Sequence, residues 1–143
     1  MEPLLITVTS FGFHFSGIPE DPSGHGGGFV FDCRGLPNPG REERFRRLTG
    51  QDAEVKAYLE SHAIVHQFVE HAYALVHMTA QNYQERGFSQ LAITFGCTGG
   101  QHRPGYCAET LTAQLQRAGF AVRIFHHDKP DLNRTDSYWS PDS

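Results

Sequence analysis

The 143-residue sequence has few cysteines, a small excess of acidic over basic residues and no long apolar run. Its three cysteines, Cys33, Cys97 and Cys107, are widely spaced, so they offer no disulfide framework and favour a reducing, cytoplasmic compartment. No stretch approaches the roughly 20 apolar residues that span a bilayer, so no membrane partner is expected. The formal net charge of −4 argues against general nucleic-acid binding, because neutralising phosphates requires clustered Lys and Arg.

Basic charge is concentrated in one segment only, interrupted by Glu42 and Glu43. Its arginines are Arg34, Arg41, Arg44, Arg46 and Arg47. Two interpretations are open. The segment is either a solvated loop and helix start, or a patch that attracts an anionic ligand or an RNA.

The order of the predicted elements is β-β-α-α-β-α-β. Strands are expected at residues 4–13, 29–33, 91–95 and 121–125, where β-formers or continuous apolar residues stand together. The first two helices are expected between Thr49 and Arg86, with Ser61 as a cap between them, and a third between Pro104 and Gly119. A strand–helix–strand unit implies a right-handed crossover and parallel strands. The sequence therefore predicts an α/β domain over residues 1–128, with a small, mainly parallel sheet of about four strands covered by helices. A poorly ordered tail is expected at 129–143.

The segment FGCTGGQHRPGY, residues 95–106, stands between the third predicted strand and the last helix. Ligands of open α/β sheets collect at the carboxyl ends of parallel strands. Two glycines let backbone N–H groups converge on an anion, and the start of the helix adds partial positive charge. A hydroxyl, an imidazole and a planar guanidinium stand in the same turn. The residues predicted to bind a phosphate group are Thr98, Gly99, Gly100, His102 and Arg103.

Cys97 and Arg103 stand at a Cys-x5-Arg spacing, which resembles the phosphate loop of cysteine-dependent phosphatases. No general acid for such a reaction can be assigned from the sequence. Asp32 and Asp128 are candidates only by their positions in the predicted fold. An inert buried cysteine is the alternative, and a non-catalytic protein is favoured. No GxxxxGK[ST] pattern occurs, so hydrolysis of ATP by a Walker A loop is not supported.

The ends of the first two predicted strands should reach the same pocket. Asp32 and Arg34 alternate onto one face and either bind the ligand or pair with each other. Asn38 is a candidate ligand residue or a turn former, and Ser10 with Gly12 is expected at the pocket floor. No metal and no cofactor is predicted.

Several motifs carry a resemblance to a known family. They are SFGF at 10–13, GIP at 17–19, VFDCRGLPNP at 30–39, LTG at 48–50, VHQF at 65–68 and GCTGGQHR at 96–103. The chain resembles the C-terminal domain of the RNase adapter protein RapZ family over most of residues 6–126.

The resemblance implies a domain that senses glucosamine 6-phosphate, associates with copies of itself and, in some members, binds small regulatory RNAs. Thr98, Gly99, Gly100, His102 and Arg103 match the ligand-binding turn. Three departures accompany the match. The ATPase half of full-length members is absent, so ATP binding is not expected. Residues 128–143 are acidic where family members carry a basic tail. Gly40 stands where the family places a ligand-facing histidine.

Overall fold

A computed structural model describes residues 3–21, 24 and 28–127 of the chain. The described strands are β1 (Leu5–Gly12), β2 (Phe29–Asp32), β3 (Gln90–Cys97) and β4 (Ala121–His126). The helices are α1 (Ala53–Glu60), α2 (Ala63–Glu85) and α3 (Arg103–Arg117), together with the short 3-10 helices η1 (Pro39–Arg41) and η2 (Glu43–Phe45). The predicted α/β class and the order of strands and α-helices are both confirmed.

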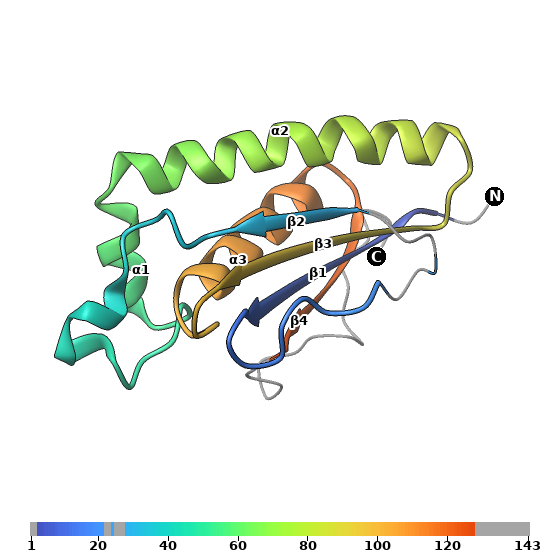
Figure 1. Ribbon diagram of the computed structural model, residues 1–143. Helices are drawn as coiled ribbons and strands as arrows, with labels where there is room; N and C mark the ends of the chain where they lie inside the picture. The colour runs from blue at the N-terminus through green and yellow to red at the C-terminus, as the bar shows by residue number, and fades with distance from the viewer. Residues whose placement is uncertain (1–2, 22–23, 25–27, 128–143) are drawn as a thin grey trace.

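The four strands form one sheet in the order β2-β3-β1-β4, and every neighbouring pair is parallel. Gly12 pairs with Cys97, and Asp32 pairs with Gly96, so these strands end at one edge. Figure 1 shows the arrowheads of β1, β2 and β3 pointing the same way, towards α1 and the 3-10 segment. The carboxyl edge of the sheet therefore faces the turn that was predicted to bind phosphate.

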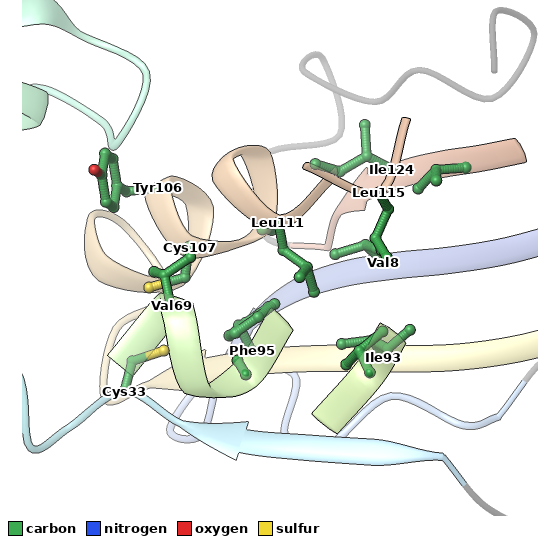
Figure 2. Close-up of a cluster of buried hydrophobic side chains, with 14 of the residues drawn as sticks. Val8, Cys33, Val69, Ile93, Phe95, Tyr106, Cys107, Leu111, Leu115 and Ile124 are labelled. Atoms are coloured by element: carbon green, nitrogen blue, oxygen red, sulfur yellow. The ribbon is translucent and has the colours of Figure 1, made fainter. Parts of the chain in front are cut away.

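The hydrophobic core lies between the sheet and two helices. Helix α3 packs on β1, β3 and β4, while α2 packs on α3 and β3. Figure 2 shows the residues that interlock there, among them Val8, Ile93, Phe95, Leu111 and Leu115. Continuous apolar sequence in β3 is explained by this burial, since residues 91–97 are all buried.

Helix α2 buries one stripe of its apolar residues and leaves others exposed. Ile64 and Leu75 recur at helical spacing, yet they are 50% and 46% exposed. The buried side chains of α2 are Val65, Val69, Ala72, Val76 and Ala80. Small and β-branched residues of α2 are fully buried where the helix lies against α3, Phe68 packs at the margin of the core, and Ile64, Leu75 and Met78 are exposed.

The ends of α2 and α3 lie where glycine was expected to stop them, and Ser61 lies at the end of α1 and not at the start of α2. Gly87 and Gly119 follow α2 and α3 with φ of 77° and 98°, values in the left-handed region that glycine tolerates. Ser61 is the residue that ends α1, and α2 begins after His62. None of the described helices is long and apolar enough to cross a membrane. The predicted tail at 129–143 lies outside the described residues.

Candidate functional site

The turn from Cys97 to Arg103 joins the end of β3 directly to the start of α3. Gly100 has φ of 73°, and its N–H donates to Cys97 Sγ at 3.1 Å. A Cβ placed on Gly12 would lie 2.7 Å from the carbonyl carbon of Gly99. The neighbouring strand therefore supports the turn at backbone contact, which only glycine at position 12 allows.

A pocket of about 640 Å³ opens beside this turn. Its volume lies within the range of roughly 300–1,000 Å³ that is typical of small-molecule sites. The described residues that line it are Arg34, Gly35, Leu36, Pro37, Asn38, Arg41, Tyr58, Ile64, Thr98 and Arg103. Three of these are arginines and none is a carboxylate, so the described lining favours an anion.

Arg103 is the buried cation of the pocket, with only 6% of its surface exposed. Its Nη1 donates to the carbonyl oxygens of Arg34 and Leu36 at 3.2 and 3.1 Å. Its Nε is buried and has no hydrogen-bond partner among the described residues. Arg103 thus fixes the segment after β2 against α3 and keeps donor capacity that the fold does not use.

Asp32 and Arg34 form an ion pair at the end of β2. The Arg34 guanidinium donates from Nε and Nη2, with a shortest distance of 2.7 Å, and the Arg34 N–H donates to Asp32 Oδ1 at 2.9 Å. Hydrogen bonding from the Arg34 side chain lowers the pKa of Asp32 below its ordinary value. The Arg34 guanidinium also lies 4.1 Å from the centre of the Phe13 ring. Of the two, Arg34 lines the pocket and Asp32 does not.

Asn38 caps the start of η1, and its Oδ1 accepts the N–H of Gly40 at 2.9 Å. Asn38 also lines the pocket. Arg41 follows in the same 3-10 helix and also lines the pocket. The segment around Asn38 is therefore both a turn former and a pocket wall.

The remaining predicted residues support the turn or lie elsewhere. The Nε2 of the buried His102 is 2.8 Å from the carbonyl oxygen of Phe45. Ser10 Oγ is 2.8 Å from His126 Nδ1, and His126 Nε2 is 2.8 Å from Glu109 Oε2. His102, Ser10, Gly12, Gly99 and Gly100 are all outside the described pocket lining.

Cys97 is buried, with 4% of its surface exposed, and it does not line the pocket. Its sulfur accepts a backbone hydrogen bond from Gly100, as a structural cysteine in a tight turn can. Cys33 and Cys107 are free and buried nearby, and Figure 2 shows their sulfur atoms in the core beside Val69. Burial, followed by the neighbouring Cys107, raises the pKa of Cys33 well above its ordinary value.

Six lining residues were not among the predicted site residues: Gly35, Leu36 and Pro37 follow β2, and Arg41, Tyr58 and Ile64 come from other elements. Tyr58 comes from α1, Ile64 from the first turn of α2, and Arg41 from η1. Arg41 had a sequence signal, because it belongs to the basic segment. Ile64 had the signal of a core residue, and its place at the pocket depends on how α2 starts after α1.

The fold and the site define a class: a small parallel α/β domain whose strand–turn–helix junction opens into a cation-lined pocket. Within that class, the chain belongs to the family of the RapZ C-terminal domain, whose model matches residues 4–130. The resemblance seen in the sequence motifs is thereby confirmed.

Individual relatives agree with this assignment. The chain is 39% identical over 127 residues to a protein named nucleotide-binding protein from Caldicellulosiruptor bescii, covering 89% of this chain and 42% of that protein. It is 37% identical over 123 residues to a nucleotide-binding protein from Thermotoga petrophila, covering 86% and 42% respectively. The chain thus spans about two fifths of the length of these relatives.

Proposed function

We propose that this domain binds a sugar phosphate and serves as a metabolite sensor or adapter of the RapZ C-terminal type. The observation that carries the proposal is the pairing of Thr98 and Arg103 at one pocket, next to a glycine turn at the carboxyl edge of a parallel sheet. Thr98 is exposed, so its hydroxyl is available to a phosphate oxygen. Arg103 supplies positive charge from a buried, fixed position.

A small phosphorylated molecule fits this pocket better than a polymer does. The pocket is of small-molecule size, and the walls from Tyr58 and Ile64 offer an apolar surface to a sugar ring. Membership of the family favours an amino-sugar phosphate such as glucosamine 6-phosphate as the first ligand to test. RNA binding and self-association are proposed on the same family grounds, and a cytoplasmic location agrees with the free, buried cysteines.

Isothermal titration with glucosamine 6-phosphate, its N-acetylated relative and inorganic phosphate tests the proposal. We expect wild-type protein to bind at least one sugar phosphate and Thr98→Ala to bind it about tenfold more weakly, the loss of one charge-assisted hydrogen bond. Ser16→Ala is the matched control, because Ser16 carries an exposed hydroxyl outside the pocket lining.

Arg103→Lys tests the planar guanidinium group of Arg103. This variant keeps the positive charge but loses the planar geometry that can hold both the segment after β2 and the ligand, so sugar-phosphate affinity should fall by at least tenfold. Thermal unfolding of the same variant measures how much of the loss comes from loosening the segment at 34–36. Sugar-phosphate binding that is equal in wild type, Thr98→Ala and Arg103→Lys would refute the proposed site.

A further inference from the structure

We propose that a groove on the face of the sheet opposite to α3 binds the chain's own C-terminal segment, residues 136–142, with Trp139 in the groove and an aspartate on Arg123. The groove shares no lining residue with the sugar-phosphate pocket. The inference is therefore independent of the proposed function.

The groove is built on β1 and β4 and closed at one side by the loop that follows β1. Ile6 and Val8 of β1 and Ile124 of β4 belong to the core beneath α3. Because side chains alternate along a strand, the residues between them point to the opposite face. There they form a groove of about 500 Å³. Among the residues that line it are Thr7, Pro19, Glu20, Arg123, Phe125 and His127.

The groove offers an aromatic surface beside an anchored cation. Arg123 is partly buried, its Nε donates to Thr7 Oγ1 at 2.9 Å, and its guanidinium carbon lies 5.5 Å from the centre of the Phe125 ring. No ion pair among the described residues includes Arg123, although Glu20 lines the same groove. A second aromatic ring can pack on Phe125 and Arg123, and a carboxylate can bind the guanidinium group. This combination suits a peptide segment better than a small inorganic anion.

The chain leaves the sheet at the rim of this groove. Strand β4 ends at His126, and the next residue, His127, lines the groove. The N–H of His127 donates to the carbonyl oxygen of Ser10 at 2.8 Å, which fixes the direction in which the chain leaves β4 beside β1. Whatever follows His127 therefore starts next to the groove.

The sequence that follows matches the chemistry of the lining. Residues 135–143 read TDSYWSPDS, with aspartates at 136 and 142, adjacent tyrosine and tryptophan, and no Lys or Arg. From His127 to Trp139 an extended chain can span up to about 40 Å, so a loop back into the groove is within reach. Such a short tether gives an effective concentration in roughly the millimolar range. The chain's own segment is therefore favoured over the same segment of a second copy.

Fluorescence of Trp139 tests the proposal on the full chain, because this residue is the chain's one tryptophan. A synthetic peptide of residues 128–143 is the reference for an unbound segment. We expect the full chain to emit at shorter wavelength than the peptide and to be quenched several-fold less by acrylamide. Arg123→Gln should weaken docking by about tenfold, the loss of a charge-assisted contact, and move both values towards those of the peptide.

Two further variants make the result specific. Arg117→Gln is the matched control, because it removes the same charge from an exposed position at the end of α3 outside the groove lining, and it should behave as wild type. Asp136→Asn combined with Asp142→Asn should expose Trp139 as Arg123→Gln does. This double variant leaves every described residue unchanged, so it separates loss of docking from loss of the fold. Thermal unfolding of Arg123→Gln is measured alongside for the same reason.

Three results would overturn the proposal. The first is a Trp139 that is quenched as readily in the full chain as in the peptide. The second is shielding that stays at the wild-type level in both Arg123→Gln and the double aspartate variant, or that is lost equally in Arg117→Gln. The third is shielding that disappears when wild type is diluted about a hundredfold, because docking within one chain does not depend on protein concentration. That third result would assign the segment to the groove of a second copy.

Discussion

Replacing Gly12 by alanine should displace the turn at residues 97–103, although Gly12 itself does not line the pocket. The new Cβ would lie 2.7 Å from the carbonyl carbon of Gly99 and 2.9 Å from the nitrogen of Gly100, both of them backbone atoms. Ordinary contact begins near 3.4 Å, so the turn has to retreat by about 0.7 Å. The backbone at position 12 is not in the positive-φ region, so strand conformation itself permits alanine.

The energetic expectation follows from two opposing terms. Overpacking against backbone costs roughly 1–3 kcal/mol, whereas alanine in a strand is favoured over glycine by about 0.5–1 kcal/mol. A net destabilisation of about 1–2 kcal/mol is expected, which lowers the Tm by about 3 °C per kcal/mol. Sugar-phosphate affinity should fall by about tenfold, because Thr98 moves with the displaced backbone.

Thermal unfolding and isothermal titration measure these two effects separately. Gly35→Ala is the matched control: Gly35 lines the pocket, yet an added Cβ would meet no atom within 4 Å. Its Tm should stay close to that of wild type. If Gly12→Ala matches wild type in both Tm and affinity, the turn is not supported by β1 as argued.

Two further predictions concern Tyr106 and Cys97. Burial, with Glu60 nearby, raises the pKa of Tyr106 to about 12, so the neutral phenol stabilises the fold up to about pH 10 and this contribution is lost as pH rises towards 12. In chemical denaturation between pH 9 and 12, the free energy of unfolding should therefore decline less for Tyr106→Phe than for wild type. An equal decline in the two proteins would contradict the raised pKa. Cys97→Ser should keep sugar-phosphate affinity within about threefold of wild type, because a serine hydroxyl can still accept the Gly100 N–H. Wild type should not hydrolyse an aryl phosphate, and hydrolysis that disappears in Cys97→Ser would instead support the phosphatase alternative.

Much of the fold could be predicted because its signals are local. Apolar continuity at 91–95 marked the central strand β3, and Gly87 and Gly119 marked the ends of α2 and α3. The face that α2 buries was harder to predict, because helical spacing identifies a stripe of apolar residues but not the element that covers it. Ile64 shows this limit, since it has the pattern of a core residue and lies half exposed at the pocket.

The candidate site divides in the same way. Thr98 and Arg103 were predicted from the turn in which they stand, since glycine, hydroxyl and guanidinium chemistry is readable over a few residues. Ser10 and His102 were predicted by strand and turn position, yet packing directs them to His126 and to the Phe45 carbonyl. A side chain's direction depends on the neighbours that satisfy its polar atoms, and those neighbours come from distant segments.

The sequence alone determined the class of domain, the order of its elements and the turn at residues 97–103, because periodicity, glycine stops and turn chemistry act over short distances. Only the tertiary structure decided the walls of the pocket. Arg41, Tyr58 and Ile64 belong to η1, α1 and α2, and they meet Arg103 because the helices pack over the carboxyl edge of the sheet.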